Sequence, residues 1–413
     1  MGRHSTRRSR RIGTNGLAAV VAQGSQAAGS LLLQVVAARS LGITGLGEFG
    51  LLYGILVLAT AISSGFVGDS LTVLDRQSHQ LKAALQNWLV LVAVVGAILC
   101  AVGVWATGFV EKQAAVAFGM ATFVFVLEDA VRRLLMASLR FWRIVVVDAT
   151  SLLVLVVVLL LAPSITLAGL FVALAAGQAC AIVVGVCLLP VEERWLALPP
   201  LPAQHRAVFD YGAFRALQQA VRPALLALTR IVVIALVGVA AAGQLEAGRI
   251  YTAPALLVVF GLNSFLFASY ALDAKSALPA ALRRADRGVR LLLAITVAFG
   301  VVAVLCVPVL GPLIAGGQYD IPVTTVVGWV VYAISVAAVT PYGALAAVRG
   351  LQAAVLAVRV GDSLVSLALA AAVAYVAGSA ECVPFGLAVG SFAGGLLIRH
   401  YVLQKPPNWS TRD

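Results

Sequence analysis

Four polar side chains share one face of an otherwise apolar segment near the middle of the chain. Arg215, Gln218, Gln219 and Arg222 are spaced at i, i+3, i+4 and i+7, which places them on one side of a helix. A guanidinium group presents a planar fork of donors that matches phosphate oxygens, and it stays charged at any physiological pH. This face therefore predicts a binding site for a phosphorylated ligand.

An amide-rich face of the same kind occurs in the first apolar segment, where Gln23, Gln26 and Gln34 lie on one side of a helix. A shift of 196 residues superposes this segment on the arginine-bearing one without gaps, and Gly47 then coincides with Gly243. The shift aligns three pairs of polar residues: Gln23 with Gln219, Gln26 with Arg222, and Gln34 with Arg230. The repeat predicts two parallel halves with a substrate site between them at mid-membrane.

Arg222 is the most deeply placed of these cations. It lies about ten residues, or about 15 Å, into its predicted helix, and a charge at that depth normally faces a water-filled cavity or a partner. The alternative to a ligand site is an ion pair with an acidic residue of another helix, such as Asp69, Asp148 or Asp362.

A second group of charges lies in the fourth predicted helix. Glu128 with Arg132 and Asp129 with Arg133 are acid-to-base pairs at i, i+4 in the favourable direction, so mutual neutralisation is the preferred interpretation. The competing hypothesis makes Glu128 a coupling residue for a proton or sodium ion.

Two further charges are candidates for function. Arg359 is a second cavity candidate, although it could pair with Asp362 at i, i+3. Asp148, near the inner end of the fifth predicted helix, either pairs with Arg143 or a seventh-helix arginine or titrates as a second coupling site.

Signals for enzymatic chemistry are absent from the sequence. It contains no GxxxxGK[ST], HExxH or CxxC motif, and its cysteines lie scattered in apolar runs without histidine neighbours. We therefore expect no catalytic residue, no ATP hydrolysis, no metal site and no cofactor.

The composition shows what positions these side chains. Of 413 residues, 62% are hydrophobic and 11% charged, and the mean hydropathy is +1.01. A soluble domain is about 45 to 50% apolar and about 25% charged, so the chain is an integral membrane protein. Apolar runs predict twelve helices, at residues 14–38, 47–71, 85–107, 114–138, 143–162, 167–190, 212–238, 247–271, 289–311, 322–346, 352–377 and 382–403.

The basic residues predict the topology. The formal net charge of +12 would suggest nucleic acid as a partner of a soluble protein, but here the excess lies in termini and loops on one side, which the positive-inside rule makes cytoplasmic. The loops of the other side are short, residues 238–246 among them, so none could hold a catalytic platform. The long inner connection that includes Arg283 and Arg290 is expected to be an interfacial helix on anionic lipid or a plain connector.

The fold class expected from these patterns is an all-α polytopic membrane protein, with about twelve transmembrane helices in two six-helix lobes related by pseudo-twofold symmetry. The predicted organisation is a basic cytoplasmic N-terminus (1–13), an N-lobe (14–190), a cytoplasmic linker (191–211), a C-lobe (212–403) and a cytoplasmic tail (404–413).

The segment 37–76 resembles the first hairpin of bacterial polysaccharide flippases, including the O-antigen type, in the superfamily that also contains the multidrug extruders. Leu41, Gly42, Gly47 and Phe49 match a first-loop element typical of that family, and RRLLMASLRFWR resembles its basic exit from the fourth helix. The usual tyrosine of the first element is replaced by glutamate, and the chain lacks the two extra helices of lipid II flippases.

The resemblance implies two lobes that rock about a central cavity lined by the first and seventh helices. It implies transport of a polyprenyl-diphosphate-linked oligosaccharide from the inner to the outer leaflet of the bacterial cytoplasmic membrane. Membrane lipids, a polysaccharide polymerase and glycosyltransferases are the implied partners. A multidrug cation antiporter of the same fold is the alternative. The deep arginines argue against cationic cargo, because like charges repel in a site of low dielectric constant.

Overall fold

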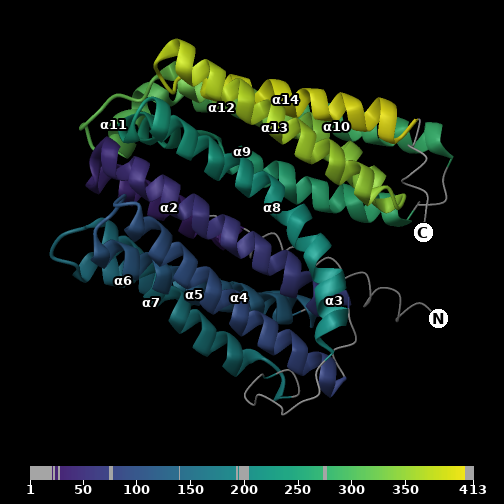
Figure 1. The fold of residues 1–413 in the computed structure, drawn as a ribbon. Coiled ribbons are helices and arrows are strands. Elements are labelled where there is room, and N and C mark those ends of the chain that lie inside the picture. The colour runs from purple at the N-terminus through teal and green to yellow at the C-terminus, as the bar shows by residue number, and fades with distance from the viewer. Residues whose placement is uncertain are drawn as a thin grey trace, which may run out of the picture. The chain divides into compact units, whose positions relative to one another are not determined.

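The computed structural model consists of helices joined by short connections (Figure 1). It describes residues 21, 24–26, 28–73, 78–138, 140–191, 194, 204–272 and 277–404. No strand occurs in this part of the chain, and eleven of its helices are long and apolar enough to cross a membrane. The chain is therefore a multi-pass membrane protein.

The first half of the chain contains helices that follow one another closely. Residues 28–40 are helical, and Gly42 begins a long helix whose last turns include a π-helical turn. The helices that follow residue 40 are α2 (Gly42–Ser63), η1 (Ser64–Gly68), α3 (Asp69–Val73), α4 (His79–Ala106), α5 (Lys112–Ala137), α6 (Phe141–Leu161) and α7 (Leu167–Leu188).

The second half of the chain also consists of helices that follow one another closely. Its members are α8 (His205–Leu236), α9 (Val239–Leu272), α10 (Leu278–Leu305), α11 (Val307–Ala315), α12 (Val323–Val348), α13 (Gln352–Ala377), α14 (Val383–Leu397) and η3 (Ile398–Val402). Pro308 stands in the first turn of α11, where its missing N–H group and fixed backbone angle separate α11 from α10.

Most predicted helices are confirmed within a few residues, but two segments predicted as connections between them are parts of helices. The predicted outer loop 238–246 is helical, because α9 begins at Val239. The predicted interfacial helix or connector is the beginning of α10, which runs without interruption from Leu278 to Leu305. Both segments are rich in alanine and carry little proline, so they extend the neighbouring helix rather than end it.

The described residues form two compact units, each made of two separate segments of the chain. Unit 1 comprises residues within 1–33 and 52–224, and unit 2 comprises 34–51 and 225–404. α2 belongs to unit 2 up to Leu51 and to unit 1 afterwards, while α8 belongs to unit 1 up to Ala224. The two lobes predicted from the sequence, 14–190 and 212–403, are expected to move relative to each other. This division into lobes stays a prediction.

Each unit has an aromatic centre among small and aliphatic side chains. In unit 1 the ring of Phe66 contacts those of Trp88 and Phe209, with centroids 5.1 and 5.9 Å apart. In unit 2 the fully buried Trp329 stacks edge-on with Tyr332 and donates a hydrogen bond of 2.8 Å to the carbonyl of Leu245. Burial of aromatic surface and this satisfied indole hydrogen bond stabilise α9 against α12.

Two glycines of the repeat bring α2 and α9 into backbone contact within unit 2. A Cβ atom on Gly47 would overlap the carbonyl oxygen of Val239, and one on Gly243 would overlap the carbonyl oxygen of Ile43. The shift of 196 residues converts one contact into the other, so a local twofold relation passes through this crossing. Only glycine allows helices to approach this closely.

Candidate functional site

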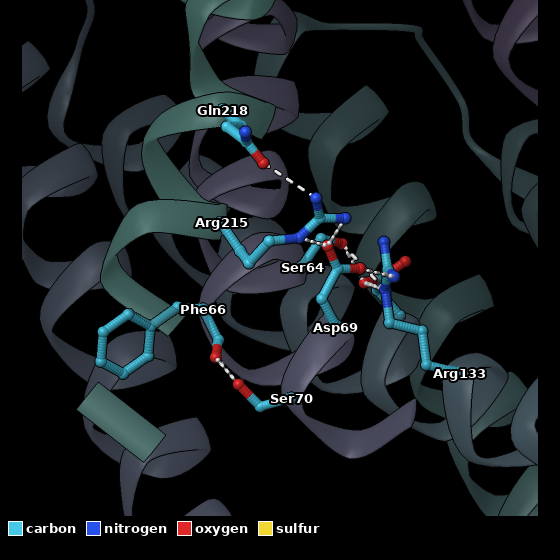
Figure 2. Close-up of polar contacts among 8 residues, drawn as sticks. Ser64, Phe66, Asp69, Ser70, Arg133, Arg215 and Gln218 are labelled. Atoms are coloured by element: carbon cyan, nitrogen blue, oxygen red, sulfur yellow. Dashed lines mark hydrogen bonds and ion pairs between the residues drawn. The ribbon is translucent and has the colours of Figure 1, made fainter. Parts of the chain in front are cut away.

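Asp69 holds two guanidinium groups inside unit 1 (Figure 2). Its Oδ2 atom accepts hydrogen bonds from Nε and Nη2 of Arg215, at 2.8 and 2.6 Å, and its Oδ1 atom lies 3.2 Å from Nη1 of Arg133. The two ion pairs of Asp69 thus join α3 to α5 and to the first half of α8. Arg215 also donates a hydrogen bond of 2.8 Å to Gln218, the residue one turn further along α8.

The same network continues through η1. Arg133 Nε lies 2.9 Å from Asp129 Oδ2 and 3.1 Å from Ser64 Oγ, and Ser64 in turn donates to Asp129. The predicted i, i+4 pair of Asp129 with Arg133 is confirmed. A Cβ atom on Gly68 would overlap the side chain of Arg133, so the glycine leaves the space through which this arginine reaches Asp69.

Close backbone packing brings α8 to this network. A Cβ atom on Gly65 would lie 2.5 Å from the carbonyl oxygen of Arg215, and one on Gly212 would overlap the carbonyl oxygen of Phe66. The two glycines therefore set the position of Arg215 opposite Asp69.

A second group in unit 1 surrounds Arg132, of which 4% is exposed. Its Nε atom lies 2.9 Å from Oδ1 of Asp148 and its Nη2 atom 3.2 Å from Oδ2, while Ser25 donates to the same Oδ2 at 3.2 Å. Glu128 Oε1 is further away, at 3.8 Å from Arg132 Nε. Two buried carboxyl groups thus share one guanidinium.

These contacts bear on two predicted pairings. Arg132 pairs with Glu128 at 3.8 Å, as the spacing predicted, but Asp148 is its nearer partner. Asp148 was expected to pair with Arg143 or with an arginine of the seventh helix. Instead Arg143 donates to the backbone carbonyl of Leu188.

Unit 2 contains a third group, which carries excess positive charge. Glu246 lies 2.6 Å from Nε of Arg230 and 2.8 Å from Nε of Arg249, and Arg249 Nη2 donates to Gln34 at 2.9 Å. Glu246, Arg230 and Gln34 are 2%, 4% and 4% exposed. Two guanidinium groups and one carboxylate leave one positive charge in the group if all three are ionised.

Arg249 was not singled out from the sequence, although it stands three residues after Glu246. The sequence predicts Glu246 in an outer loop, where residues three apart do not share a helix face, but α9 already includes Glu246 and Arg249. The repeat pair of Gln34 and Arg230 does meet in this group, through Glu246 and Arg249. Glu246 fits there because Gly50 of α2 has no side chain to occupy the same space.

The remaining candidates lie on α8, on α13, in the residues before α2, or outside the described residues. Arg222 is partly buried in α8, directly before Pro223. It lies two residues before Ala224, the last residue of α8 that belongs to unit 1. Gln26 is partly buried, Gln219 is exposed, and Gln23 lies outside the described residues. Arg359 pairs with Asp362 at 3.3 Å, as its spacing predicted.

The described residues contain no group of three or more histidine, cysteine, aspartate or glutamate side chains that could hold a metal ion. The three groups described above consist of ion pairs, which join helices, and their arginines are suited to bind anions.

No protein-family model matches the sequence, and no curated protein matches it. Solved structures match along nearly the whole chain. An inward-facing multidrug resistance MATE family transporter of the MOP superfamily has a TM-score of 0.68 at 14% identity, with 92% of this chain and 96% of that chain covered. An outward-facing MATE family transporter has a TM-score of 0.64 at 13% identity, with coverage of 96% and 97%.

A third solved structure is a MOP superfamily transporter from Pyrococcus furiosus, for which reverse polarity of the binding pocket suggests a different function. Its TM-score is 0.63 at 12% identity, and 96% of each chain is covered. The chain therefore has the helical fold of MOP superfamily transporters, and the fold class predicted from the sequence is confirmed.

Proposed function

We propose that the chain moves a polyprenyl-diphosphate-linked oligosaccharide from the cytoplasmic to the outer leaflet of a bacterial cytoplasmic membrane by alternating access. The fold it shares with MOP superfamily transporters supports a transport role. In this proposal it acts beside glycosyltransferases that build the glycan and a polymerase that extends it.

The observation that carries the proposal is the sign of the charges on α8 and α9. Arg222 lies in the middle of α8, and Arg230 and Arg249 outnumber Glu246 two to one. A diphosphate is a dense anion, and arginines that are already partly desolvated bind it more strongly than they would in water. A cationic substrate would be repelled by the same residues.

α8 is suited to couple such binding to movement. The first part of α8, up to Ala224, belongs to unit 1 and the rest belongs to unit 2. Pro223 stands directly before Ala224 at this boundary. A proline inside a helix leaves one backbone carbonyl without its partner and is a common point of bending. Arg222 would then move with this bend, which links the ligand to the change between inward-facing and outward-facing states.

A multidrug cation antiporter is the second candidate. Two of the similar solved structures are multidrug resistance transporters. In addition, Glu128 and Asp148 share one guanidinium, so one carboxyl group is available to exchange a proton or bind a sodium ion.

Reconstitution in liposomes separates the two. We expect the protein to move a fluorescent polyprenyl-diphosphate-linked sugar across the bilayer and to leave a cationic dye such as ethidium untransported. Arg222→Ala should abolish glycan movement, whereas Arg206→Ala, which removes an exposed arginine from the start of the same helix, should not. Ethidium transport driven by a proton or sodium gradient, without glycan movement, would establish the antiporter instead.

A further inference from the structure

The outward stripe of α10 changes character abruptly along its length. Its first three turns expose four arginines: Arg283, Arg284, Arg287 and Arg290. From Leu291 onward the exposed positions of the same stripe are apolar, with Leu291 53%, Val301 54% and Leu305 72% exposed. The cationic and apolar parts meet between two consecutive residues.

Contacts beside the arginines and on the opposite side of α10 hold this stripe outward. Asp286 accepts hydrogen bonds from Tyr342 at 2.7 Å and from Arg399 at 3.1 and 3.2 Å, which tie it to α12 and η3. Ala281 and Ala285 are buried in the same unit. These turns carry four arginines and one acidic residue, and that acid is also bonded to Arg399, so an excess of positive charge remains at the surface.

The apolar part of the stripe is long enough to contact an acyl chain of one leaflet. Leu291 to Leu305 spans about 21 Å at 1.5 Å per residue, which exceeds half of the hydrocarbon core. A hydrocarbon core is about 30 Å thick with a polar layer of several ångströms on each side. Leu291 at the edge of the hydrocarbon core would place Arg287 and Arg290 at the level of the phosphates.

We propose that this part of α10 is a binding site for an anionic phospholipid, with its phosphate held by Arg283, Arg287 and Arg290. One acyl chain would lie along Leu291 and the apolar residues that follow. The arginines bind the phosphate by paired N–H donors. The apolar part of the stripe, which contacts the acyl chain, offers no binding site to soluble anions. The site belongs to unit 2 alone and does not depend on which substrate is transported.

The test uses the full-length protein in nanodiscs of phosphatidylglycerol and phosphatidylcholine in equal amounts, followed by native mass spectrometry of the lipids that remain bound. Wild type should retain phosphatidylglycerol in preference to phosphatidylcholine. Arg287→Gln should lower this preference by roughly fivefold, and the triple variant R283Q/R287Q/R290Q should abolish it. Arg206→Gln, which removes one exposed arginine elsewhere, is the matched control and should leave the preference unchanged.

Two further arms distinguish a lipid site from other roles of positive charge. The triple lysine variant keeps the charges that orient the helix in the membrane but loses the fork, so it should insert normally and retain only part of the preference. Inorganic phosphate should compete only weakly. Unchanged preference in the single and triple glutamine variants, equal loss in Arg206→Gln, or full displacement by inorganic phosphate would each overturn the proposal.

Discussion

Arg132 illustrates how a buried cation is balanced by groups from different helices. Its guanidinium donates a hydrogen bond to Asp148 of α6 and lies further from Glu128 of its own helix. Breaking a buried pair by removing one partner costs about 3 to 5 kcal/mol, because the remaining charge has no solvent to stabilise it. The two carboxyl groups therefore differ in importance.

We expect Asp148→Asn to destabilise the protein by about 3 to 5 kcal/mol and to lower its abundance in the membrane. Glu128→Gln should have a smaller effect, because Arg132 keeps its nearer partner. Thermal unfolding of the purified variants in detergent measures both. A larger loss in Glu128→Gln would assign the main pair to Glu128. Normal stability together with transport that no longer responds to pH would make Glu128 the coupling residue.

Arg222 allows its structural and functional roles to be measured separately. If it holds a diphosphate, Arg222→Ala should abolish glycan export while the protein still accumulates at the wild-type level. Arg222→Lys should restore only part of the activity, since a point charge replaces a bidentate fork. Gln26→Ala, at the repeat position, should have a weaker effect because an amide supplies no charge.

Export and abundance must be measured on the same cells. A fall of both in Arg222→Ala would show that the arginine neutralises a buried acid rather than a ligand. Full export at normal abundance would remove Arg222 from the site.

At the level of elements, backbone contact between helices decides where side chains can be placed. The crossing of α2 and α9 at Gly47 and Gly243 holds the helices that carry Gly50 and Glu246, and hence the group around Glu246. A Cβ atom at this crossing overlaps backbone, which cannot move away as a flexible side chain could.

Gly243→Ala should therefore destabilise unit 2 by about 1 to 3 kcal/mol or more, even though alanine is the better helix former. Gly103→Ala in α4 is the matched control, because a Cβ atom there meets nothing within 4 Å. That variant should be neutral or more stable by up to about 1 kcal/mol. Equal melting temperatures in detergent for the two variants would contradict the close contact.

At the level of the whole molecule, the distribution of basic residues predicts the orientation in the membrane. In the topology predicted from the sequence, Arg39 and Lys112 are the only basic residues clearly placed in outer loops. The arginines around residues 283–290 and at both ends of the sequence are predicted to lie on the other side. Anionic lipid and the membrane potential retain such residues in the cytoplasm.

A reporter fused after Asp413, or inserted near His205, should therefore be active as a cytoplasmic fusion and inactive as a periplasmic one. The paired use of green fluorescent protein and alkaline phosphatase measures both states. Alkaline phosphatase activity at either position would refute the predicted topology.

Patterns along the sequence are enough to predict the membrane-spanning helices, the relation between Gly47 and Gly243, and the pairs Asp129 with Arg133 and Arg359 with Asp362. Each of these follows from periodicity along the chain, because apolar runs and i, i+3 or i, i+4 spacings act locally. The tertiary structure alone decided that Arg132 faces Asp148, that Asp69 holds Arg133 and Arg215, and that Arg249 joins Arg230 at Glu246. These partners lie on different helices, so their meeting depends on where glycines allow close packing and on which direction each side chain leaves its helix, neither of which a single segment encodes.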